Sequence, residues 1–357
     1  MPATNGPVPF ASATDAPKFP PASASGSAPR TSATSETNLN KRNELLHCMR
    51  NNQLVVVLGT GVSLQTVGHP GTGTAVAGWV GLLEHGLAHC GHHQLITPAD
   101  AGIVDLQIKA GTTERLIDAA QIIHDCLAKR ENQRYFWLKE SVGQLVAKDP
   151  RLIRAIEVLG GAIATLNYDG LISQVTRRPP LHWRQQSEIT RFLRFHRKDY
   201  TLHMHGYWED PDSVVLDRKS YEAIKADLKM RSLLNHLARF ETMLFIGCRQ
   251  TFFDPNFQAW LDWAHNVLEG EKQRHYILCR SSEEADLLKE LQPHGYLVPL
   301  VYGDTYEDLV PFLDSLASES AGVVPSNPPA MATSPIVFGA TGHVRKPVEV
   351  WKLQSHR

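Results

Sequence analysis

Three polar side chains follow directly on an apolar run in "ATLNYDG", residues 164–170. The run before them suits a strand that is covered on both faces. Asn167, Tyr168 and Asp169 then bring an amide, a phenol and a carboxylate to the end of that strand. Two interpretations are open. Either Asp169 caps the next helix while Asn167 satisfies backbone groups, or Asn167 holds a ribose or a water and Asp169 accepts from an amide of a ligand.

Glycines follow a second apolar run, "LVVVLG" at residues 54–59. The five residues at this point are Gly59, Thr60, Gly61, Val62 and Ser63. Glycine lets the backbone approach a pyrophosphate closely, with amide groups directed at the anion. The dinucleotide fingerprint G-x-G-x-x-G opens a helix directly, but here the sixth position is Leu64, and we expect a long loop before a helix that begins at about Trp79. An ordinary tight turn is the alternative interpretation.

Two histidines alternate with apolar residues in "TLHMHG", residues 201–206. This alternation predicts a short strand with His203 and His205 on one face. Two such imidazoles could bind a metal, but no third ligand is obvious nearby. We therefore expect no metal and one histidine that acts as a general base near neutral pH. A hydrogen-bonded histidine beside Gly206 is the alternative.

A fourth group lies in "LFIGCRQTFFDPNF", residues 244–257. Gly247 and Cys248 end an apolar run, where the backbone could approach a second part of the same ligand. Cys248 has no base close in sequence, and a small buried cysteine is commoner than a nucleophilic one. Asp254 followed by Pro255 predicts the start of a helix over about residues 255–268.

Short apolar runs alternate with helical stretches between residues 41 and 318. The runs lie at residues 54–59, 161–167, 242–247, 275–279 and 296–303. Helices are expected near residues 75–90, 112–130, 132–148, 151–159, 218–240, 255–268, 281–292 and 305–317. This order predicts an α/β fold, a Rossmann-like doubly wound parallel sheet with an inserted helical region. The ligand crevice of such a sheet lies beyond the carboxyl ends of the strands.

Composition limits the function classes. The 357 residues are 42% hydrophobic and 20% charged, with a net charge of −1, which argues against a nucleic-acid module. Five scattered cysteines indicate a reducing, cytoplasmic compartment, and no apolar run approaches the ~20 residues that span a membrane. We expect an Ala/Ser/Pro-rich flexible tail over residues 1–40, a catalytic domain over 41–318 and a flexible tail over 319–357.

Taken in order, "GTGVS", "TLNYD", "HMHG", "VVLDRKSY" and "LFIGCRQTFFDPNF" resemble the sirtuin-like superfamily over most of residues 52–318. The resemblance is closer to the NAD-hydrolase branch, which includes bacterial anti-phage effectors, than to the protein deacylases. That branch has a T-T-N-Y-D signature, a histidine–glycine pair, and a glycine followed by an aspartate–proline pair. Here these correspond to residues 165–169, to His205 with Gly206, and to Gly247 with Asp254 and Pro255.

Three departures from the superfamily pattern bear on the branch. Leu166 stands where deacylases carry glutamine and the hydrolase branch usually carries threonine, and Thr60 stands at the alanine between the two glycines. The four-cysteine zinc ribbon of deacylases has no counterpart among the scattered cysteines. The resemblance therefore implies NAD⁺ binding without a metal and disfavours deacylation.

The resemblance also implies a role for each matched residue. His205 would act on a hydroxyl of the nicotinamide ribose as base or acceptor, and Asn167 would orient the attacking water or the ribose. Asp169 would contact the carboxamide or organise the pocket. Residues 59–63 would hold the pyrophosphate, and Gly247 with Cys248 would hold the adenosine side. The products would be nicotinamide and ADP-ribose or its cyclic form.

The same resemblance implies that activity is gated by homo-oligomerisation or by a regulatory partner, in a role such as anti-phage immunity. Two alternatives stay open. One is a sensor or scaffold that binds NAD or ADP-ribose without turnover. The other is a zinc-free, NAD-dependent protein deacylase.

Overall fold

The structure is a computed structural model of the chain that describes residues 31–68, 75–195, 198–249, 274–291 and 295–322. One sheet has the strand order β3-β4-β2-β1-β5-β6-β7, and every neighbouring pair runs parallel. Its strands are β1 (Leu54–Leu58), β2 (Ala162–Thr165), β3 (Pro180–His182), β4 (Thr201–His203), β5 (Thr242–Ile246), β6 (His275–Arg280) and β7 (Leu297–Gly303). The predicted Rossmann-like α/β fold is confirmed.

Helices cover both faces of the sheet. All residues of β1 are apolar because its side chains are buried on both of these faces. Val56 and Leu58 enter one buried cluster, whereas Val55 and Val57 enter another. Each fully buried Val or Leu contributes roughly 1.5–3 kcal/mol relative to an exposed one. The first cluster is covered by α1 (Thr31–Arg50), α2 (Thr60–Val67), α7 (Arg151–Val158) and α14 (Leu309–Ala321). The second is covered by α9 (Gln186–Phe195), α10 (Arg218–Ala226), α11 (Leu228–Phe240) and α13 (Ser281–Glu290).

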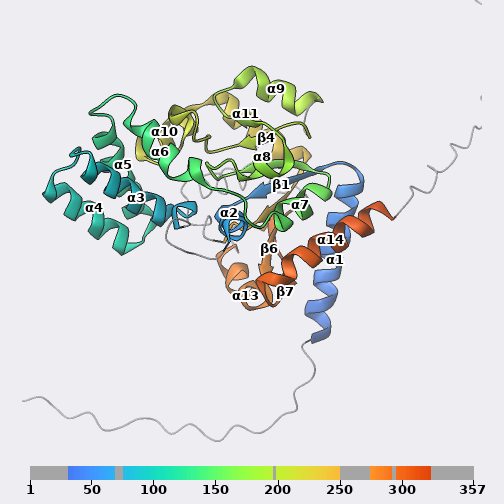
Figure 1. The fold of residues 1–357 in the computed structure, drawn as a ribbon. Coiled ribbons are helices and arrows are strands. Elements are labelled where there is room, and N and C mark those ends of the chain that lie inside the picture. The colour runs from blue at the N-terminus through green and yellow to red at the C-terminus, as the bar shows by residue number, and fades with distance from the viewer. Residues whose placement is uncertain (1–30, 69–74, 196–197, 250–273, 292–294, 323–357) are drawn as a thin grey trace, which may run out of the picture.

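A helical layer is inserted between β1 and β2, as the sequence predicted. It consists of α3 (Trp79–His92), α4 (Pro98–Ala110), α5 (Thr113–Leu127) and α6 (Gln133–Glu140), which gather beside the sheet in Figure 1. Helix α8 (Leu171–Thr176) follows β2. The short 3₁₀ turns η1 (Ala75–Ala77), η2 (Val142–Gln144), η3 (Pro211–Ser213) and η5 (Tyr306–Asp308) complete the described elements.

The strand order places the topological switch point of the sheet at the carboxyl ends of three strands. The chain passes from β1 to β2 on one side, and β5 later pairs with β1 on the other side. Ligands of doubly wound sheets bind where the strand order reverses in this way. The amide of Gly59 donates to Ile246 O at 2.9 Å and that of Leu166 donates to Leu58 O at 3.0 Å, so the carboxyl ends of β1, β2 and β5 are held together.

The prediction of a long loop after the first glycine turn is wrong. Helix α2 begins at Thr60, directly after Gly59, which is extended at φ −108° and ψ −176° and forms the N-cap. Val62 and Val67 are buried against the first core cluster, and this packing stabilises a helix that the two glycines disfavour by propensity. The glycine sequence therefore does open a helix at once, as in dinucleotide-binding turns.

Other boundaries differ for local reasons. The helix expected over 218–240 is two helices, because Asp227 Oδ1 accepts from the amides of Lys229 and Met230 and starts α11 anew. The helix expected over 132–148 ends at Glu140. Helices α4 and α9 were not predicted. The expected helix over 255–268 lies outside the described residues.

Helix α1 begins at Thr31, within the stretch expected to be a tail. The Asn38 side chain donates to Val301 O and accepts from Val301 N, both at 3.1 Å, and Lys41 Nζ donates to Pro299 O at 2.8 Å. Helix α1 therefore covers the outer side of β7, where no further strand pairs. Covering an edge strand in this way protects a sheet from pairing with other chains. In the described part of the chain no helix has the length and apolar character needed to cross a membrane.

Candidate active site

Asn167 lies at the carboxyl end of β2 and is held at several points. Its Nδ2 donates to Gly59 O at 2.9 Å and to Ser63 Oγ at 2.8 Å, and its backbone amide donates to Thr165 Oγ1 at 3.1 Å. Gly59 O only accepts, so the amide nitrogen must face it. The Oδ1 of Asn167 has no protein partner within the described ranges. This acceptor is therefore the part of the side chain that remains for a ligand or water.

Asp169 completes a chain of buried polar groups. Ser63 Oγ accepts from Asn167 and donates to Asp169 Oδ2 at 2.6 Å, and Asp169 Oδ1 accepts from the amide of Leu171 at 3.0 Å. Burial raises the pKa of Asp169, although the Ser63 hydroxyl and the Leu171 amide oppose this rise. The capping interpretation holds in part, because Asp169 accepts from the amide of the first residue of α8, although Gly170 is the N-cap. Contact of Asp169 with a ligand stays a prediction.

The glycine turns after β1 and β5 are in direct backbone contact. The amide of Gly61 donates to Gly247 O at 2.9 Å, and that of Val62 donates to Gly59 O at 3.0 Å. A Cβ on Gly59 would lie 2.7 Å from Gly247 O, so close packing alone already requires glycine there. Among the described residues, the amide of Thr60, the first of α2, has no acceptor. Of the predicted phosphate donors, Thr60 is thus the best placed, because a helix N-terminus attracts anions.

Cys248 and Leu166 turn their side chains into the core. Both belong to the second buried cluster, and Cys248 Sγ lies 3.6 Å from Val57 O. Burial raises the pKa of the Cys248 thiol, so it stays protonated and is a poor nucleophile. Only the backbone at Gly247 and Cys248 remains for the predicted ligand contact. Leu166 fills the core where deacylases carry a polar side chain.

The two histidines after β2 lie in different surroundings. Strand β4 ends at His203, and His205 follows in a turn. His203 is fully buried, and its Nδ1 lies 3.0 Å from Asn167 O. Burial lowers the pKa of His203 to about 4, so it is neutral at physiological pH. His205 is 5% exposed and packs edge-on against Tyr221, which leaves it as the candidate base.

A strap, defined as residues 213–217, connects this site to the helical layer. The amide of Val215 donates to His205 O at 2.8 Å, and Tyr168 OH donates to Val215 O at 2.7 Å. From α6, Arg134 Nη2 donates to Val214 O at 2.9 Å. The strap thus holds the backbone of His205. The strap is itself anchored by Tyr168 and, through Arg134, by the inserted helical layer. Sequence reasoning missed this role of Tyr168 because only the fold brings 168 and 215 together.

Replacing Tyr168 by phenylalanine removes one hydroxyl and leaves the ring. We expect the free energy of unfolding to fall by about 1 kcal/mol, because the carbonyl of Val215 loses its donor. Urea unfolding at pH 7 measures this. Tyr135→Phe is the matched control, since the Tyr135 hydroxyl has no partner among the described residues. An equal effect of both substitutions would show that the strap contact is unimportant.

Stability should fall as the pH is lowered from about 6.5 to about 4. In this window an unfolded His203 binds a proton, whereas the folded one, with its pKa lowered to about 4, does not. One such group changes the free energy of unfolding by on the order of 2–3 kcal/mol across the window. His275, whose pKa burial lowers to about 3, acts in the same direction. Denaturant unfolding at several pH values should give a shallower slope for His203→Asn, and an unchanged slope would contradict this assignment.

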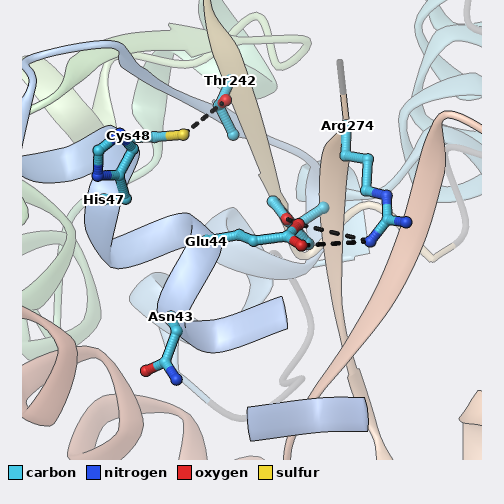
Figure 2. A pocket seen from close by; sticks show the side chains of 7 residues that line it. Asn43, Glu44, His47, Cys48, Thr242 and Arg274 are labelled. Carbon is cyan, nitrogen blue, oxygen red and sulfur yellow. Dashed lines mark hydrogen bonds and ion pairs between the residues drawn. The ribbon is translucent and has the colours of Figure 1, made fainter. Parts of the chain in front are cut away.

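A hollow of about 440 Å³ lies at the amino ends of the strands, opposite the carboxyl ends where Asn167 lies. Figure 2 shows its lining, which comes from α1 and from the amino ends of β5 and β6. Its charged groups are paired with each other or with a neighbour: Glu44 accepts from Tyr276 OH at 2.6 Å and pairs with Arg274 at 3.4 Å. The hollow contains none of the predicted site residues. Within the described ranges, no group of three or more His, Cys, Asp or Glu residues is placed to hold a metal ion.

Residues 161–296 match the SIR2-like domain family. The matched segment contains Asn167, Asp169, His205 and Gly247, whereas the turn at 59–63 precedes it. SIR2-like domains bind NAD, and the carboxyl ends of β1, β2 and β5 are where a doubly wound sheet of this strand order holds such a ligand. Over residues 161–296, the fold and this match together support a likeness to the sirtuin-like superfamily.

Proposed function

We propose that this protein is an NAD⁺ glycohydrolase that cleaves the bond between nicotinamide and ribose. The observation that carries the proposal is the state of Asn167. Its two amide hydrogens are committed to Gly59 O and Ser63 Oγ, which leaves Oδ1 as an acceptor at the crevice. A side chain that only filled space would not need two fixed hydrogen bonds at a strand end.

The chemistry asks little of the protein beyond positioning. NAD⁺ carries a good leaving group, and cleavage passes through an oxocarbenium-like state. Asn167 Oδ1 accepts a hydrogen bond from the attacking water, and His205 accepts from a ribose hydroxyl. The C1′–nitrogen bond breaks with its electrons going to nicotinamide, a water oxygen bonds to C1′, and the water's second proton leaves to solvent. Asp169 helps to position Asn167 indirectly, by accepting a hydrogen bond from Ser63.

The glycine turns after β1 and β5 would hold the remaining parts of the dinucleotide. The N-terminus of α2, through the amide of Thr60, would hold the pyrophosphate. The backbone at Gly247 would face the adenosine side. Because Gly61 N and Val62 N already have internal acceptors, we expect fewer backbone donors for the phosphates than a full glycine-rich loop supplies.

Leu166 favours hydrolysis over deacylation within this proposal. It is 7% exposed and lies in the second core cluster, so no polar side chain from this position reaches the crevice. An acyl peptide would lack the glutamine that the deacylase pattern places there. Water is then the natural acceptor for the ribosyl group.

The direct test is incubation of the purified protein with NAD⁺ across protein concentrations, with products identified by mass. Release of nicotinamide with ADP-ribose or its cyclic form is expected. His205→Ala should lower the rate on the order of 100-fold or more, whereas His92→Ala, an exposed histidine of α3, should not. Equal rates in all three proteins would contradict the proposal. Binding of NAD⁺ without product would favour a sensor, and acyl-peptide turnover would favour a deacylase.

We also propose that the activity is gated, since unrestrained cleavage would empty a cell of NAD⁺. Self-assembly or a regulatory partner is the expected gate, and loss of NAD⁺ in an infected cell is the role that fits the anti-phage branch. A specific rate that rises with protein concentration would support self-assembly. A rate that depends on neither concentration nor any partner would contradict gating.

A further inference from the structure

We propose that His203 is a positioning residue that holds the peptide of Asn167 in its working orientation. Asn167 O faces His203 Nδ1 at 3.0 Å, and no other donor to this carbonyl exists among the described residues. The inference rests on the proposed function for its kinetic readout, but the contact itself belongs to the folded chain.

The chemistry of the contact fixes the state of the ring. A carbonyl oxygen only accepts, so Nδ1 must carry the proton. Nε2 is then an acceptor; it is buried and has no partner within the described ranges. Burial lowers the pKa of His203 to about 4, although the hydrogen bond to Asn167 O opposes this shift and neighbouring His182 adds slightly to it. The ring is therefore a neutral imidazole with one hydrogen-bond donor, which points at Asn167.

The position of His203 explains why this donor matters. Asn167 is held through its amide by Thr165 and through its side chain by Gly59 and Ser63. Those three residues belong to β2, to the β1 turn and to α2. His203 supplies the anchor from β4.

Strand β4 leads directly into His205, and the amide of Met204 donates to Thr165 O at 2.9 Å. His203 thus joins the strand that carries the candidate base to the residue that carries the candidate acceptor. Without it, the Asn167 peptide could rotate and change the spacing between the two catalytic groups.

Two substitutions separate the donor from the bulk of the ring. Asparagine places its Nδ2 two bonds from Cβ, as histidine does with Nδ1, so His203→Asn keeps a donor at the same place. His203→Leu puts a methyl group there and removes the donor. His182→Leu is the matched control, because His182 is a buried histidine paired with His203 in register but makes no hydrogen bond to Asn167 among the described residues.

The expected result is a split between kcat and KM. His203→Leu should lower kcat for NAD⁺ cleavage about 10-fold to 100-fold while KM changes less than about threefold, because misplacement of a catalytic group acts on the chemical step. His203→Asn should recover kcat to within about threefold of wild type, and His182→Leu should stay in that range. Equal losses in the leucine and asparagine variants, or no loss in either, would overturn the proposal.

A second measurement does not depend on activity or on a folded leucine variant. In ¹⁵N spectra of the wild-type protein, His203 should give an Nδ1–H resonance of a neutral ring that does not titrate between pH 7 and 5. The side-chain amide resonances of Asn167 should move more in His203→Leu than in His203→Asn. An Nε2–H tautomer would overturn the proposal even if NAD⁺ is cleaved. If NAD⁺ is not cleaved, the Nδ1–H tautomer would show that only the proposed function has failed.

Discussion

Replacing Asn167 by alanine is expected to lower kcat/KM for NAD⁺ cleavage at least about 100-fold. The substitution removes Oδ1, the acceptor that we assign to the attacking water, and a single positioning or polar group in a transition state is worth about that much. It also removes one of the two donors to Gly59 O and the hydrogen bond that Asn167 donates to Ser63 Oγ. The free energy of unfolding should therefore fall by about 1–3 kcal/mol. Single-turnover kinetics on protein shown to be folded by circular dichroism separate the two effects.

Asn51→Ala is the matched control for this substitution. Asn51 is an exposed asparagine just after α1, at the amino edge of the sheet, and its side chain contacts only His47 among the described residues. We expect wild-type kinetics and stability from it. An Asn167→Ala protein that is folded and cleaves NAD⁺ at the wild-type rate would remove the central catalytic assignment.

The largest loss of stability is expected from Gly206→Ala. Gly206 has φ +93°, a conformation that residues with a side chain rarely adopt, and a Cβ there would lie 2.1 Å from Ser213 O. The obstacle is the backbone of the strap, which cannot move without releasing the Val215 contact to His205. Overpacking and backbone strain together should cost about 3 kcal/mol or more. Thermal and urea unfolding measure the change.

Gly102→Ala provides the contrast. Gly102 lies inside α4, and a Cβ there meets nothing within 4 Å. Alanine should stabilise the helix by about 0.5–1 kcal/mol. If Gly206→Ala were as harmless as Gly102→Ala, the strap could not be seated over the histidine–glycine pair as described.

Much of the fold could be predicted from the sequence because the central strands are short and almost wholly apolar. Runs such as residues 54–58 and 242–246 have no alternation, and this is the mark of strands buried on both faces. Helix α2 was missed because Gly59 and Gly61 argue locally for a loop. Burial of Val62 and Val67 overrides that preference. Asn38 was missed because its partner, Val301, is remote in the chain.

The site could be predicted only in part, again because some of its contacts join residues that are remote in the chain. Residue type and position at a strand end were enough to single out Asn167 and Asp169. Their link through Ser63 was not predictable, because it joins positions 63, 167 and 169 across two strands and a helix. His203 and His205 looked equivalent by alternation. The contact of His203 Nδ1 with Asn167 O, which only the fold creates, separates His203 from His205.

The most direct test of the account is a crystal structure of the wild-type protein with an NAD⁺ analogue whose ribose ring oxygen is replaced by methylene, which resists cleavage. The account predicts that the nicotinamide ribose lies between Asn167 and His205, with a ribose hydroxyl about 3 Å from the imidazole and the scissile carbon facing Asn167 Oδ1. An analogue bound in the hollow beside Glu44 and Arg274 at the amino edge, or an imidazole and amide that face different ligand groups, would contradict it.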